Sequence, residues 1–336
     1  MTAGTRVRVL AGAALIAVLA GCGALSPPAQ SAGAGGSQSG PGRSAAPSPT
    51  SLPYNMSGLL DPTGGKFFGV EAQGAPSLAP VASFAASVGK KPDLVGQYLA
   101  WNSSFDAKAV DAAWSYGALY YIAWEPYGTT AQAIADGQSD GYISRFASAV
   151  RALNLPVAIS FGHEMNGNWY PWGTGQTSAA QFVAAWRHIH NLFIQAGASN
   201  VIWVWNPNVI SAEPRLDLSA YYPGDAYVDW VGVTGYFGAE GPDTFEGVYG
   251  PTMQEIRGFT TKPFIIAETS VGTGPDAAAA AQNLVTGVRQ RSDVLGFVWF
   301  DYDKAGVDWR LESRPPVQAP IAAGVAGLRL VDTKRP

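Results

Sequence analysis

Charged residues are scarce in this chain, where Asp, Glu, Lys and Arg together make up 14% of the sequence and the formal net charge is −4. No long run of like charge occurs, and nucleic-acid-binding proteins usually carry a basic stripe, so we expect no nucleic-acid partner. Histidine and cysteine are rarer still, with three residues and one residue. The single cysteine excludes an intramolecular disulfide.

Metal-binding motifs are lacking as well. His163-Glu164 begins like the zinc pattern H-E-x-x-H, but Gly167 stands where the second histidine would be. We therefore expect no metal ion and no other cofactor. Tryptophan, by contrast, is plentiful at 11 residues, which suits a ligand with flat, weakly polar faces such as sugar rings.

The N-terminus has the pattern of an export signal. Arg6 and Arg8 precede an apolar run, Val9–Ala20, which is too short to span a bilayer. The run ends in Leu19-Ala20-Gly21-Cys22, which resembles the lipobox of bacterial lipoproteins. We expect residues 1–22 to be a lipoprotein signal with Cys22 as the lipidation site, so that the protein is exported and meets the membrane only through this anchor. A plain secretory signal is the alternative.

Residues 23–53 are rich in Ser, Pro, Gly and Ala and are predicted to be a flexible linker. Residues 54–336 are predicted to be one catalytic domain, a (β/α)8 barrel, because short apolar runs alternate with longer amphipathic stretches. A doubly wound open sheet would give a similar pattern. We expect a capping box at Ser178 and Gln181, and Asp276 as the cap of a later helix. The expected strands are 66–71, 93–100, 118–124, 156–161, 201–205, 230–234, 263–267 and 294–300.

Acidic and aromatic residues gather where the predicted strands end, which is the catalytic end of such barrels. Cleavage of a glycosidic bond needs two carboxyl groups, one as acid and one as nucleophile or base. Spacing alone does not choose the pair. The candidates by position are Glu71, Glu125, Glu164, Glu268 and Asp301.

The stretch His163-Glu164-Met165-Asn166-Gly167-Asn168-Trp169-Tyr170-Pro171-Trp172-Gly173 resembles the strand-4 signature of glycoside hydrolase family 26, the β-mannanase family. The segments 231–236, 265–270 and 298–301 are similar to the strand-6, strand-7 and strand-8 segments of that family. The resemblance implies a retaining (β/α)8 enzyme that acts on a polysaccharide or oligosaccharide. It implies Glu164 as acid/base and Glu268 as nucleophile.

The same resemblance implies several substrate contacts. Tyr236 matches a tyrosine that hydrogen-bonds the nucleophile, His163 the histidine beside the acid/base, and Trp299 the platform under the sugar at the cleavage point. Further side chains expected to contact sugar are Asn166, Trp169, Trp172, Trp124 and Asn206. Glu71 and Tyr98 are interpreted as barrel-filling or rim residues. The protein is expected to be a monomer.

Two departures from the mannanase pattern affect the substrate more than the mechanism. Ser160-Phe161-Gly162 replaces a frequent Arg-Pro before the His-Glu pair, and Glu71 lies where a sugar-contacting histidine is common. We expect the protein to cleave internal β-1,4 linkages of mannan. Mixed-linkage β-glucan, β-1,3-xylan or a glycan of the cell's own envelope are alternatives, and a non-catalytic carbohydrate-binding lipoprotein is another.

Overall fold

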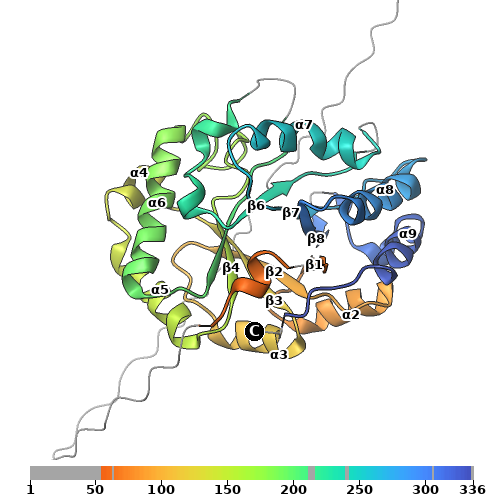
Figure 1. The fold of residues 1–336 in the computed structure, drawn as a ribbon, viewed down its shortest axis with the longest axis horizontal. Coiled ribbons are helices and arrows are strands. Elements are labelled where there is room, and N and C mark those ends of the chain that lie inside the picture. The colour runs from red at the N-terminus through yellow and green to blue at the C-terminus, as the bar shows by residue number, and fades with distance from the viewer. Residues whose placement is uncertain (1–53, 63, 211–215, 239–241, 305, 334–336) are drawn as a thin grey trace, which may run out of the picture.

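The structure is a computed structural model that describes residues 54–62, 64–210, 216–238, 242–304 and 306–333. Eight parallel strands follow one another in sequence order and close into a barrel (Figure 1). The prediction of a (β/α)8 barrel is confirmed and the open-sheet alternative is wrong. The expected signal, Cys22 and the linker lie outside the described residues. The strands are β1 (Phe67–Ala72), β2 (Leu94–Ala100), β3 (Leu119–Glu125), β4 (Val157–Phe161), β5 (Val201–Trp205), β6 (Trp230–Thr234), β7 (Phe264–Thr269) and β8 (Val294–Asp301).

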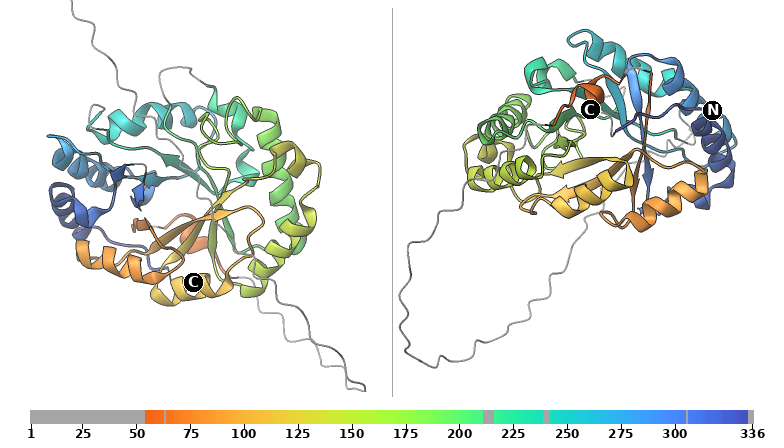
Figure 2. Two further views of the ribbon diagram at one scale, coloured as in Figure 1. Left: turned by 180° about the vertical axis from the view of Figure 1, so that it is seen from behind. Right: turned by 60° about the horizontal axis from the view of Figure 1, so that its bottom comes forward.

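Helices form a ring around the barrel, as both views in Figure 2 show. Between β5 and β6 the described residues form two 3-10 helices, η1 (Leu218–Tyr221) and η2 (Asp225–Tyr227). None of the helices in the described part of the chain is long and apolar enough to cross a membrane. The α-helices are α1 (Ser57–Leu60), α2 (Leu78–Val88), α3 (Ala107–Tyr116), α4 (Ala131–Ala135), α5 (Asp140–Leu153), α6 (Ala179–Ala196), α7 (Phe245–Arg257), α8 (Ala277–Gln290) and α9 (Pro315–Ala326).

Helix starts were predicted with mixed success. Ser178 caps α6 in a full capping box, because its hydroxyl accepts from the Gln181 amide and the Gln181 side chain accepts from the Ser178 amide. Asp276 occupies the N-cap position of α8, but its side chain makes no capping hydrogen bond. The expectation that its carboxylate caps this helix is therefore wrong.

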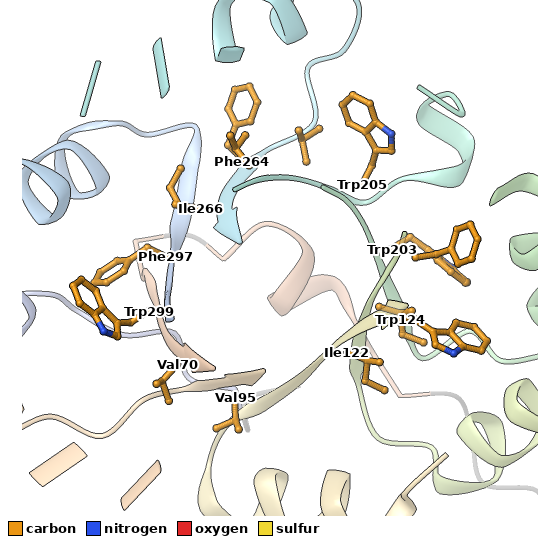
Figure 3. Packing of buried hydrophobic residues seen from close by; sticks show 14 of the residues in the cluster. Val70, Val95, Ile122, Trp124, Trp203, Trp205, Phe264, Ile266, Phe297 and Trp299 are labelled. Atoms are coloured by element: carbon orange, nitrogen blue, oxygen red, sulfur yellow. The ribbon is translucent and has the colours of Figure 1, made fainter. Parts of the chain in front are cut away.

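Large apolar side chains fill two layers on either side of the strands. The inner layer closes the barrel with residues such as Phe67, Ile202 and Val298. The outer layer lies between strands and helices, and it holds Trp124 and Trp299 (Figure 3). Both faces of each strand are thus apolar, as expected for a parallel sheet covered on both sides.

The N-terminal end of the barrel is closed by the segment that precedes β1. Met56 and Leu59 of this segment pack into the inner layer, and the Trp230 indole donates a hydrogen bond to the Leu60 carbonyl. Ionisable groups gather at the opposite end, where the strands finish. This is the end at which barrel enzymes build their active sites.

Candidate active site

Glu164 lies in the turn that follows β4, and the backbone holds it in place. Its φ is 54°, in the left-handed region that non-glycine residues avoid at a cost of about 1–3 kcal/mol. Its amide donates to the Asn206 carbonyl at 2.7 Å, which ties the turn to the end of β5. A strained residue held this way is characteristic of functional sites.

The Glu164 carboxyl accepts two hydrogen bonds. The Asn208 amide donates to Oε1 at 2.5 Å and the Trp169 indole donates to Oε2 at 2.8 Å. Burial raises the pKa of this carboxyl to about 7, with a further contribution from the nearby charge of Glu268, while the two donors oppose the rise. Near neutral pH, Glu164 therefore holds a proton that it can release.

Glu268 faces the same space from β7, and a register shift makes this possible. The pairing runs from Gly232↔Ile265 to Thr234↔Glu268, so β7 has one residue more than β6 over this interval. Ile265 and Ala267 both point into the barrel, and simple alternation would turn Glu268 outward. A β-bulge re-aims a side chain in this way, and bulges are frequent next to active sites.

Two tyrosines donate hydrogen bonds to the Glu268 carboxylate. Tyr236 donates to Oε1, and Tyr98 donates to Oε2 at 2.5 Å. Burial raises the pKa of Glu268, while Tyr236, Tyr98 and the charge of Lys304 favour the ionised form. The two glutamates thus have different surroundings. Phenol donors favour the charge on Glu268, and burial beside that charge favours the proton on Glu164.

His163 helps to hold the turn that carries Glu164. Its ring is buried, Nε2 lies 3.2 Å from the Tyr170 hydroxyl, and its carbonyl accepts from the Trp172 indole at 2.7 Å. Burial, followed by the charge of Lys304, lowers the pKa of His163 to about 3, so the imidazole is neutral. Trp172 stacks on Tyr170 and is itself buried, so these side chains form the packed wall behind the acid.

The asparagines near Glu164 make contacts that differ from the predicted ones. Asn206 is buried inside the barrel, where its side-chain oxygen accepts from Thr234, and it is not at the cleft surface. Asn166 bonds both the amide and the carbonyl of Asn208, which fixes the backbone there. Asn208, which the sequence did not single out, carries the amide that reaches Glu164.

Two tryptophans that were predicted to contact sugar lie away from the active site. Trp124 and Trp299 are both 0% exposed and lie outside the barrel among the helices, where Trp124 stacks on Phe146 (Figure 3). Neither is placed to contact a sugar, and we correct both predictions. The reason is strand alternation: Val298 and Phe300 face inward, so Trp299 between them faces outward. Phe300, the next residue, packs against Tyr98 and Tyr236.

The segment after β8 brings a positive charge to the site. Lys304 belongs to β9 (Asp303–Lys304), which pairs with β10 (Val307–Asp308) in a short hairpin. Its ammonium lies 5.5 Å from the Phe300 ring and 5.9 Å from the Tyr98 ring. Its charge lowers the pKa of Glu164 and of Glu268, and no sequence pattern pointed to it.

Comparison with known proteins gives a consistent result. Residues 132–267 match the model of glycosyl hydrolase family 26. Endoglucanase H of Acetivibrio thermocellus is 32% identical over 259 residues, which cover 73% of this chain and 28% of that protein. A protein named mannan endo-1,4-beta-mannosidase A and B, from Caldalkalibacillus mannanilyticus, is 30% identical over 164 residues, 46% of this chain and 29% of the relative. The chain thus spans under a third of the length of these two relatives.

Solved structures agree on the fold. The modular endo-beta-1,4-mannanase from Cellulomonas fimi superposes with a TM-score of 0.61 at 16% identity, over 82% of this chain and 74% of that one. Identity at this level supports the barrel architecture alone. The family model and the sequence relatives carry the assignment further, and the chain belongs to glycosyl hydrolase family 26.

Proposed function

We propose that this protein is a retaining glycoside hydrolase that cleaves internal β-1,4 linkages of a mannan-type polysaccharide. The observation that carries the proposal is the contrast between two buried carboxyls at one end of the barrel. Glu268 accepts from two tyrosines, and Glu164 is a weakened acid held by Asn208 and Trp169. Hydrolysis of a glycosidic bond requires two carboxyl groups, one of which favours the protonated form while the other favours the ionised form.

In the first step, an oxygen of the Glu268 carboxylate bonds to the anomeric carbon while the glycosidic bond breaks. Glu164 gives its proton to the leaving oxygen, so no alkoxide is released. In the second step, Glu164, now a carboxylate, takes a proton from water, and the water oxygen displaces Glu268 from the anomeric carbon. Both carboxyls return to their starting states, and two inversions give net retention.

Mannan is our proposed substrate because the sequence relative from Caldalkalibacillus mannanilyticus is named as a mannan-cleaving enzyme. The name of the other sequence relative, Endoglucanase H, keeps β-glucan as the alternative. Turnover of glucomannan, galactomannan, barley glucan and β-1,3-xylan by the purified protein will decide between them.

The catalytic assignment is tested with Glu164→Ala and Glu268→Ala on the best substrate of that panel. Each variant is expected to lose release of reducing ends by on the order of 10⁴-fold or more, as removal of a central catalytic group does. With an aryl glycoside whose leaving group departs without a proton, azide should rescue both, yielding the β-glycosyl azide with Glu164→Ala and the α-glycosyl azide with Glu268→Ala. Ordinary activity in either variant would end the assignment.

We further propose that the protein is exported and anchored at the cell surface through a lipid on Cys22. The support is the sequence that ends in Leu19-Ala20-Gly21-Cys22. Expression of the whole chain in a bacterial host tests this: Cys22→Ser should move the protein from the membrane fraction to the soluble exported fraction. Membrane association that survives this change would contradict the anchor.

A further inference from the structure

One tyrosine in the site contacts two carboxyl groups. The Tyr98 hydroxyl lies 2.8 Å from Oε2 of Glu71 and 2.5 Å from Oε2 of Glu268. The two acids come from β1 and β7, which flank β8 in the closed barrel, and Tyr98 from β2 contacts both. Glu71 and Tyr98 were expected to be barrel-filling or rim residues, yet Tyr98 contacts the nucleophile and Glu71 contacts Tyr98.

Counting protons restricts the state of this group. A phenol has one proton and can donate one hydrogen bond, although its oxygen can also accept. Burial, followed by the charges of Glu268 and Glu71, raises the pKa of Tyr98 well above its ordinary value, so the phenol stays protonated. If both glutamates were ionised, one of the two short contacts would have no proton between its oxygens. One of the two acids must therefore be neutral.

Burial and hydrogen bonds favour the proton on Glu71. Glu268 has a second donor in Tyr236, whereas Tyr98 is the one hydrogen-bond partner recorded for the Glu71 carboxyl among the described residues. Glu71 is also the more deeply buried, at 1% exposure against 9% for Glu268. An isolated carboxyl in such surroundings favours its neutral form.

The barrel provides a specific space for this side chain. Gly96 of β2 lies opposite Glu71 in the strand pairing, and a Cβ atom at position 96 would come within 2.3 Å of the Glu71 Cγ. Only glycine at position 96 leaves room for the Glu71 carboxyl to reach Tyr98. The remaining ionisable groups that act on these residues are Glu125, Lys304, Tyr121, Tyr236 and Tyr302.

We propose that Glu71 is a positioning residue that keeps its proton and donates it to Tyr98, so that Tyr98 in turn donates only to Glu268. This inference rests on the proposed function in one respect, since it takes Glu268 as the nucleophile. The directed chain Glu71–Tyr98–Glu268 fixes the attacking carboxylate from one side, while Tyr236 fixes it from the other. No proton has to leave these hydrogen bonds during turnover.

The proton on Glu71 is tested without any substrate. Infrared difference spectra of Glu71→Gln against the unmutated chain, both in a Glu164→Gln background, are recorded at about pH 6, where an ordinary glutamate is ionised. We expect loss of the carbonyl stretch of a protonated carboxyl. Glu246→Gln is the matched control, because Glu246 is an exposed glutamate paired with Arg291, and it should lose carboxylate bands instead. Loss of carboxylate bands from Glu71→Gln would overturn the proposal.

The positioning role is tested by comparing Glu71→Gln with Glu71→Met in the otherwise unmutated enzyme. Gln keeps a donor for Tyr98, so kcat should remain within about threefold of the parent, whereas Met should lower kcat by about tenfold with KM little changed. Equal activity of the two variants, or a rise in KM alone, would overturn the role. Thermal unfolding of Glu71→Met shows whether it folds, and the infrared result stands even if no substrate is turned over.

Discussion

The hydrogen bond from Asn208 to Glu164 offers a quantitative test of how this site sets the strength of its acid. Asn208→Ala removes the 2.5 Å donor from Oε1 and leaves the Trp169 bond to Oε2 in place. A hydrogen bond to an ionised group contributes about 1.5–3 kcal/mol, against about 0.5–1.5 kcal/mol for a neutral acceptor. The difference favours the carboxylate by about 1–1.5 kcal/mol, which corresponds to about one pH unit.

The direction in which the pH profile of Asn208→Ala moves follows from the role of Glu164. Its pKa is about 7, and the first chemical step requires the protonated form, so activity falls as the pH rises through this value. Without Asn208 the carboxylate is less favoured and the pKa rises. The alkaline limb of kcat/KM should therefore move upward by about one pH unit.

The assay is the rate of reducing-end release across the pH range at low substrate concentration, where kcat/KM reports the free enzyme. Trp169→Phe, which removes the other donor, should shift the limb in the same direction. Thr174→Val is the control, because its hydroxyl bonds the Gly167 carbonyl in the same loop and does not touch Glu164. An alkaline limb that stays in place in Asn208→Ala, or moves downward, would refute the reasoning.

Three further predictions concern other parts of the site. Tyr236→Phe removes a donor from Glu268 and should lower kcat by about 10- to 100-fold with little change in KM, and wild-type kcat would contradict the role of this phenol. Lys304→Met removes a cation that lowers the pKa of both Glu164 and Glu268, so both limbs of the pH profile should move upward, less so at high salt; unmoved limbs would count against it. Trp299→Ala should destabilise the fold by about 3–5 kcal/mol in denaturant unfolding, and Trp299→Phe should leave KM unchanged, whereas a raised KM would restore its sugar-platform role.

The barrel itself could be predicted because its strands are short apolar runs separated by helices. β5 and β6 were predicted at their observed bounds, and the other strands differ by one or two residues at one or both ends. The orientation of individual side chains was less predictable. Strands buried on both faces have no polar alternation, so nothing in the sequence showed that Trp124 and Trp299 face the helices.

The candidate site was predictable where a local motif carries it and less so where tertiary geometry does. Glu164 and its partner Trp169 lie in one continuous stretch, and the structure brings them together. Glu268 reaches the site only through the register shift of β7, which depends on the pairing of two strands. The contact between Glu71 and Tyr98 depends on the closure of β1 against β2 and on the space left by Gly96, and no sequence spacing reports that.

The stereochemistry of the first product tests the central claim most directly. Proton NMR in deuterated buffer follows the anomeric signal of the new reducing ends during the first minutes of hydrolysis, before mutarotation. If Glu268 attacks the anomeric carbon and water then displaces it with help from Glu164, the β-anomer appears first and the α-anomer grows in later. An α-anomer at the earliest times would mean a single displacement by water and would contradict the account.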